Sequence, residues 1–117
     1  MDNATFTQLL KELADTKVVR VTGSFADGTQ HEDSDIDFRV KPNKPDYRFY
    51  DLEPNIKKVI NVLKKYGLKL GSTSTGYVHT HNLGNELPYQ IELSDLFWKR
   101  KNKLKQVEIM GVTFNTY

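Results

Sequence analysis

Apolar residues recur at helical spacing in two parts of the chain. The first predicts a helix over residues 4–15, with Thr5 as its N-cap and Gln8 completing a capping box. The second predicts a helix that begins at Leu52, with Asp51 as its N-cap, and ends before Gly67. The apolar positions that define these helices are Phe6, Leu9, Leu10 and Leu13 in the first, and Ile56, Val59, Ile60, Leu63 and Tyr66 in the second.

The remaining apolar positions alternate or cluster as they do in strands, and small or polar residues separate the segments. These patterns predict strands at residues 18–22, 35–40, 68–72, 77–82, 89–93, 106–110 and 112–115. The order of helices and strands predicts an α+β fold: a small mixed β-sheet with helices mainly on one face.

Length and composition narrow the class of protein. A chain of 117 residues is expected to form a single domain, residues 1–117. It contains no cysteine, which excludes disulfides and thiolate metal sites. No apolar run is long enough to cross a membrane, and the N-terminus does not resemble a signal peptide. We therefore expect a cytoplasmic protein with no membrane partner.

Charge is distributed unevenly along the chain. Residues 1–55 contain 7 Lys and Arg against 11 Asp and Glu, whereas residues 56–117 contain 10 against 4. The densest basic run is residues 99–105, which could steer a polyanion such as nucleic acid toward an acidic site. The alternative is a solvated loop or helix end.

The candidate chemistry lies between residues 23 and 37. Gly23 and Ser24 follow one predicted strand, where a small-residue turn lets the backbone approach a phosphate. Asp35 and Asp37 begin the next strand, and the two-residue period of a strand places both on its polar face. Two carboxylates this close repel each other unless a cation lies between them, and a divalent ion fits that role.

This segment, from Gly23-Ser24-Phe25-Ala26-Asp27-Gly28 to Ser34-Asp35-Ile36-Asp37, resembles the signature of the nucleotidyltransferase superfamily. The superfamily has a DNA polymerase beta-like fold, and the pattern is most similar to its minimal and abortive-infection-type members. Asp27 departs from it, because close relatives often have a basic residue there.

The resemblance implies a third carboxylate on a later strand. Glu92 is our candidate, because Tyr89, Ile91 and Leu93 form the apolar face and leave Glu92 on the other; Asp95 is the alternative, beyond the end of the strand. By the same resemblance, Asp35, Asp37 and Glu92 would bind two Mg²⁺ or Mn²⁺ ions and carry catalysis. Gly23 and Ser24 would hold the phosphates of a nucleoside triphosphate, whose nucleoside monophosphate passes to a hydroxyl acceptor.

Several partners and functions remain open at this point. The acceptor could be an RNA end, a protein side chain or a small molecule. Larger relatives continue past the last strand pair. Either the acceptor meets the core of this chain directly, or another subunit supplies the missing wall of the acceptor site. That subunit would be a second copy of the chain or a partner protein. The alternative function is a non-catalytic binding module that acts as an antitoxin or as an inhibitor of a partner protein.

Overall fold

The computed structural model describes residues 1–32, 34–41, 54–70, 77–81, 87–94 and 105–116. Its helices are α1 (Asn3–Asp15), α2 (Ser24–Asp27) and α3 (Pro54–Lys65). Its strands are β1 (Val19–Thr22), β2 (Ile36–Val40), β3 (Lys69–Leu70), β4 (Tyr77–His81), β5 (Ile91–Ser94), β6 (Gln106–Ile109) and β7 (Val112–Asn115). Residues 42–53, which include the predicted cap Asp51, lie outside the described residues.

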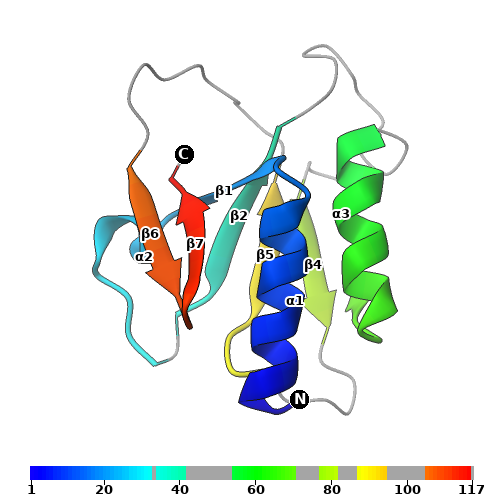
Figure 1. Ribbon diagram of the computed structural model, residues 1–117, viewed down its shortest axis with the longest axis horizontal. Helices are drawn as coiled ribbons and strands as arrows, with labels where there is room; N and C mark the ends of the chain where they lie inside the picture. The colour runs from blue at the N-terminus through cyan, green and yellow to red at the C-terminus, as the bar shows by residue number, and fades with distance from the viewer. Residues whose placement is uncertain (33, 42–53, 71–76, 82–86, 95–104, 117) are drawn as a thin grey trace.

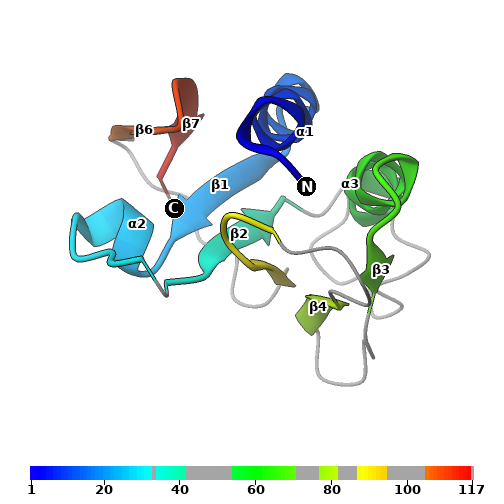
Figure 2. The same ribbon diagram turned by 90° about the horizontal axis from the view of Figure 1, so that it is seen from below.

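Five of the strands form one mixed sheet in the order β1-β2-β5-β4-β3. Strands β2 and β5 are parallel, and the other neighbours are antiparallel. Helices α1 and α3 lie on the same side of this sheet, and the β6–β7 hairpin lies beside α1 (Figures 1 and 2). The α+β fold with helices mainly on one face is confirmed.

The core lies between the sheet and this covering layer. Every apolar residue predicted for the buried face of α1 is buried, and Val59, Ile60 and Leu63 of α3 are buried as well. The hairpin joins the core through Phe114, whose ring centroid lies 5.2 Å from that of Phe38 on β2. Apolar burial therefore holds the hairpin against the main sheet, together with a backbone bridge between Val21 on β1 and Thr116 directly after β7.

The N-terminus of α1 differs from the prediction. The helix begins at Asn3, and its N-cap is Asp2, whose Oδ1 accepts a hydrogen bond of 2.7 Å from the Thr5 backbone N–H. This hydrogen bond holds the pKa of Asp2 below its usual value. Thr5 as N-cap was therefore wrong: the Asp2 carboxylate satisfies the free Thr5 N–H, and the helix begins ahead of Thr5, at Asn3.

The predicted end of the second long helix before Gly67 and the predicted break between the last two strands at Gly111 are both confirmed. Gly67 follows α3 with φ +77°, and the N–H groups of Gly67 and Leu68 donate to the carbonyls of Lys64 and Leu63, as in a Schellman motif. Met110 and Gly111 connect β6 to β7 with φ values of +50° and +81°, which are typical of a tight hairpin turn. Among the described residues, no helix is long and apolar enough to cross a bilayer.

Candidate nucleotidyltransfer site

The Gly23-Ser24 segment forms one helical turn, where the sequence predicted only a turn of chain. Gly23 precedes α2 with φ +71° and ψ −150°, a conformation that is essentially restricted to glycine. Its carbonyl accepts hydrogen bonds of 3.1 Å from the N–H groups of Ala26 and Asp27. Gly28 then ends the turn in the left-handed conformation. Ser24 is thus held at the start of α2, directly after β1.

The absence of a side chain at Gly23 makes room for Asp37. A Cβ atom at residue 23 would lie 2.5 Å from Oδ2 of Asp37, which is closer than real Cβ contacts. The Asp37 carboxylate therefore lies against the backbone of the Gly23-Ser24 segment. The structure brings together two parts of the chain that the sequence analysis connected only through the resemblance.

Strand register places Glu92 beside Asp37. Thr22 on β1 is paired with Asp37 on β2, and Asp37 with Glu92 on the parallel strand β5. The flanking residues Ile91 and Leu93 are buried, whereas Asp37 and Glu92 are half-buried. The register thus places Glu92 next to Asp37, while its assignment as the third carboxylate of the site stays a prediction.

Asp35 lies one residue before β2 and is exposed. Ser34 fixes the chain at this point: its Oγ accepts a hydrogen bond of 2.9 Å from the His31 N–H, and its own N–H donates to the His31 carbonyl. On the other side of Asp35, the N–H of Ile36 donates to the Gln90 carbonyl at 2.8 Å. Ser34 was part of the signature but was not assigned a role; its two hydrogen bonds with His31 hold the chain directly before Asp35.

A second positioning contact was missed by the sequence analysis. The Phe25 ring on α2 meets the Tyr89 ring edge-to-face, with centroids 5.0 Å apart, and Phe25 is buried. This contact anchors α2 to the segment that leads into β5, so it ties Ser24 to the strand that carries Glu92. Its only sequence signal was an aromatic residue inside the signature.

Asp37 and Glu92 lie at paired positions of β2 and β5, but the described acidic side chains do not form a complete metal site. In the described part of the chain, no three His, Asp or Glu side chains are gathered into a group that could hold a metal ion. The donor set itself is all oxygen, and Mg²⁺ commonly uses one or two carboxylates, with waters and substrate phosphates as its other ligands. Asp95, the alternative third carboxylate, and residues 99–104 of the basic run lie outside the described residues.

Comparison with known proteins identifies the family of the chain. The family model described as "Nucleotidyltransferase domain" matches residues 5–76, which is more than half of the chain. The chain therefore belongs to the nucleotidyltransferase family, with its polymerase beta-like fold.

One curated relative is a putative protein adenylyltransferase of Methanocaldococcus jannaschii. The two are 40% identical over 55 residues, which make up 45% of this chain and 64% of the relative. The chain thus spans somewhat less than two thirds of that protein. No solved structure matches significantly.

Proposed function

We propose that the protein transfers a nucleoside monophosphate from a nucleoside triphosphate to a hydroxyl acceptor, with release of pyrophosphate. The observation that carries this proposal is the contact between Gly23 and Asp37. It joins the phosphate-binding half of the family signature to its carboxylate half, in a chain that belongs to the family.

Each residue has a distinct part in this reaction. Gly23 and Ser24 bind the terminal phosphates through backbone N–H groups and the Ser24 hydroxyl. Asp35, Asp37 and Glu92 would hold divalent cations together with the phosphates of the bound nucleotide, and Glu92 would accept the proton of the attacking hydroxyl. Bound Mg²⁺ would supply charge stabilisation for the entering and leaving oxygens. The rigid contacts around Ser34 and Phe25 keep these groups aligned, and alignment itself lowers the barrier.

For the acceptor, the name of the relative favours a protein hydroxyl and ATP as the nucleotide, because the relative is named as a protein adenylyltransferase. RNA ends remain the other acceptor class to test. Both can be distinguished in one assay, because ribonuclease and protease remove different labelled products.

The test is incubation with α-labelled nucleoside triphosphates, Mg²⁺ or Mn²⁺, and total cell RNA or total cell protein. We expect transfer by the wild-type chain and a loss of about a hundredfold or more in Asp37→Asn, because positioning and metal binding fail together. Asp35→Asn and Glu92→Gln should also lose activity.

Asp27→Asn is the matched control. Asp27 is an exposed acidic residue on α2, so its substitution makes the same change of charge near the site without touching the three carboxylates. Transfer that survives in Asp37→Asn, or that is absent from the wild type with every nucleotide, metal and acceptor, would refute the proposed function.

A further inference from the structure

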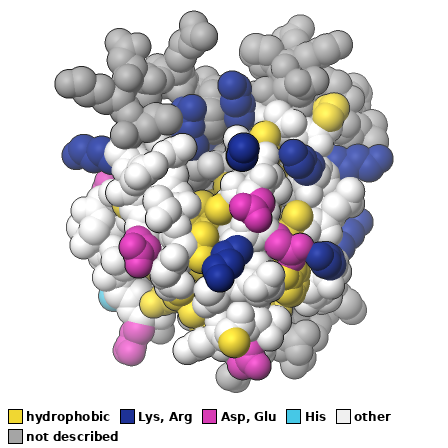
Figure 3. Space-filling view, viewed as in Figure 1, with side chains coloured by type: hydrophobic (Ala, Val, Ile, Leu, Met, Phe, Trp, Pro, Cys, Tyr) yellow, Lys and Arg dark blue, Asp and Glu magenta, His cyan; other side chains and the backbone are white. Residues whose placement is uncertain are grey.

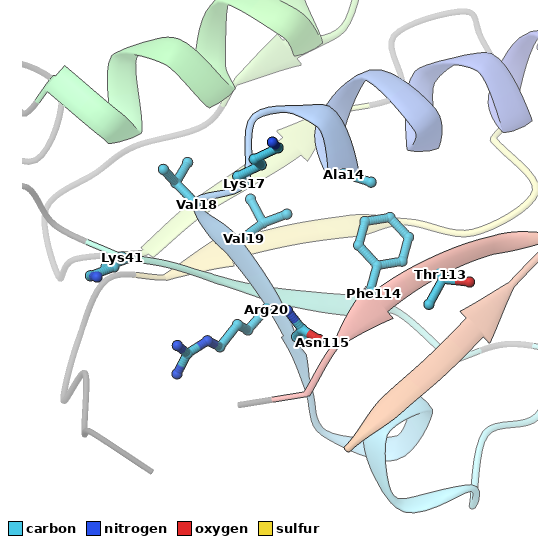
Figure 4. Close-up of a pocket in the computed structure, with 9 residues that line it drawn as sticks. All are labelled: Ala14, Lys17, Val18, Val19, Arg20, Lys41, Thr113, Phe114 and Asn115. Atoms are coloured by element: carbon cyan, nitrogen blue, oxygen red, sulfur yellow. The ribbon is translucent and has the colours of Figure 1, made fainter. Parts of the chain in front are cut away.

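A cavity of about 310 Å³ opens at the outer edge of β1, between the C-terminal end of α1 and β7. Figure 4 shows its lining side chains coming from these elements and from the residue that follows β2. None of the five candidate residues of the nucleotidyltransfer site lines it. It is therefore a separate site, and the family signature assigns it no role.

The cavity wall is basic. Lys17, Arg20 and Lys41 line it, together with the polar side chains of Thr113 and Asn115, and no acidic residue is among the described residues that form the wall. Arg, Lys, Thr and Asn side chains are the groups that most often contact phosphate and sugar oxygens in nucleic acids. The wall thus offers cations and neutral hydrogen-bonding groups around one opening, with the Lys17 ammonium and the Arg20 guanidinium pointing away from each other on either side of β1 (Figure 4).

The surface around the cavity extends this positive charge. The Asn55 side chain at the start of α3 donates a hydrogen bond of 2.8 Å to the Lys41 carbonyl, and Lys58 Nζ lies 3.3 Å from the Thr16 carbonyl. These contacts bring the first turns of α3, with exposed Lys57 and Lys58, close to the cavity. Figure 3 shows Lys and Arg gathered along the upper part of this face, with most Asp and Glu below.

Lys17 has an unfavourable backbone conformation at this place. It follows the C-cap of α1 with φ +61°, at a position where helices usually have glycine or asparagine. A left-handed conformation costs a residue with a Cβ atom about 1–2 kcal/mol. Such strain is often found at functional sites, and here the strained residue contributes a cation to the cavity.

Arg20 connects the cavity to the candidate site along the sheet. It lies on β1 opposite Arg39 of β2, and two residues further along these strands Thr22 lies opposite Asp37. Two residues of a strand span about 7 Å. A strand of linked phosphates could therefore contact the cavity and extend toward the carboxylates.

We propose that this cavity binds the phosphate backbone of a single-stranded nucleic acid. The charge of the wall, its mixture of Arg, Lys, Thr and Asn, and the line of Arg20 and Arg39 toward Asp37 favour a linked series of phosphates over an acidic protein segment. Binding at this site does not require nucleotidyl transfer.

The test measures fluorescence anisotropy of a labelled short single-stranded RNA, with EDTA present so that no transfer occurs. Lys17→Gly and Lys41→Gln should each weaken binding about fivefold. Each should also reduce the slope of log affinity against log salt by about 0.7, the loss of one phosphate contact. Lys64→Gln, an exposed residue in the last turn of α3, is the charge-matched control and should bind as the wild type does.

Lys17→Gly also tests whether weaker RNA binding simply reflects a less stable fold. Because glycine relieves the strain at residue 17, this variant should unfold at a higher temperature than the wild type while binding RNA more weakly. Equal RNA affinity in the Lys17, Lys41 and Lys64 variants would overturn the proposal. So would equal affinity for a labelled polyglutamate peptide, which would indicate an acidic protein, or complete competition by ATP or inorganic phosphate, which would indicate a site for a free anion. Binding is measured in EDTA without nucleotide, so a failure of nucleotidyl transfer would leave this result standing, and a failure of RNA binding would leave the proposed function standing.

Discussion

At the scale of single residues, the contact between Gly23 and Asp37 imposes the tightest requirement in the candidate site. Both the left-handed backbone at Gly23 and the 2.5 Å approach to Asp37 Oδ2 exclude a side chain. Gly28 provides a natural comparison, because it also has a positive φ, of +75°, but nothing lies within 4 Å of an added Cβ. Substituting each glycine in turn therefore distinguishes the effect of backbone strain alone, at Gly28, from strain combined with displacement of the Asp37 carboxylate, at Gly23.

We expect Gly23→Ala to abolish transfer and to lower the free energy of unfolding by about 1–3 kcal/mol. Gly28→Ala should lower it by about 1–2 kcal/mol, from the backbone alone, and should retain transfer. Urea unfolding and the labelled-nucleotide assay measure the two effects. Full activity in Gly23→Ala would contradict the position assigned to Asp37.

The residues of the site could be predicted because each has a local signal in the sequence. Strand alternation placed Asp37 and Glu92 on polar faces, and the signature singled out Gly23, Ser24 and Asp35. The contacts that position them had no such signal. Phe25 meets Tyr89, and Ile36 bonds to Gln90, across separations that no local pattern encodes. The cavity beside β1 was missed for the same reason.

At the scale of elements, the packing of α1 against α3 includes a polar group of three residues. Lys65 Nζ donates to Glu12 Oε1 at 2.5 Å, and this hydrogen bond, with a smaller contribution from Tyr66, lowers the pKa of Glu12. Burial, with a further contribution from Glu12, raises the pKa of Tyr66 from 10.0 to about 12. The two shifts predict opposite effects of pH on stability.

A raised pKa means that the folded protein favours the neutral phenol. The contribution of Tyr66 to stability should therefore be complete below pH 10 and should disappear as the pH rises toward 12. Thermal unfolding of Tyr66→Phe and the wild type should show a difference that shrinks across this interval. Tyr89→Phe is the matched control, and a pH-independent difference for Tyr66→Phe would contradict the assignment.

Glu12 should behave in the opposite sense. Its lowered pKa stabilises the fold above the usual value of 4.5, and this contribution should be lost as the pH falls through the lower folded value. Glu12→Gln should therefore be less sensitive to acid than the wild type in the same measurement. If the melting temperatures of Glu12→Gln and the wild type fall equally in acid, the partly exposed ion pair between Glu12 and Lys65 is too well screened by solvent to contribute to stability.

Element prediction succeeded where periodicity was strong and was wrong where short-range capping decided the outcome. The apolar faces of α1 and α3 follow directly from helical spacing. The start of α1 depended on which of two side chains, Asp2 or Thr5, capped it, and both are good N-cap residues. Helix α2 has only four residues, too few for any periodicity to show.

At the scale of the whole molecule, the β6–β7 hairpin is a separate sheet joined to the main one through apolar packing and a backbone bridge between Val21 and Thr116. Phe114 is only 3% exposed and packs on Phe38 of the central strand β2. An isolated two-stranded hairpin is marginally stable in water. We therefore propose that residues 1–117 unfold as one cooperative unit.

Phe114→Ala should lower the free energy of unfolding by about 3–5 kcal/mol and should reduce the melting temperature of the entire chain. Calorimetry checks this: the calorimetric and van't Hoff enthalpies of the wild type should agree. Thr113→Ala, on the exposed side of the same strand, should have little effect. Two separate transitions, with only one shifted by Phe114→Ala, would show that the hairpin unfolds alone.

The parallel pairing of β2 with β5 also has a consequence for the order in which the protein folds. Asp37 meets the Gly23 segment through the neighbouring strand β1, which is close in sequence, whereas Glu92 reaches Asp37 only when strands more than fifty residues apart come together. Contacts between distant parts of a chain form slowly. A chain emerging from the ribosome would bring the glycine loop and Asp37 together first, and Glu92 would join them only after β5 had been synthesised.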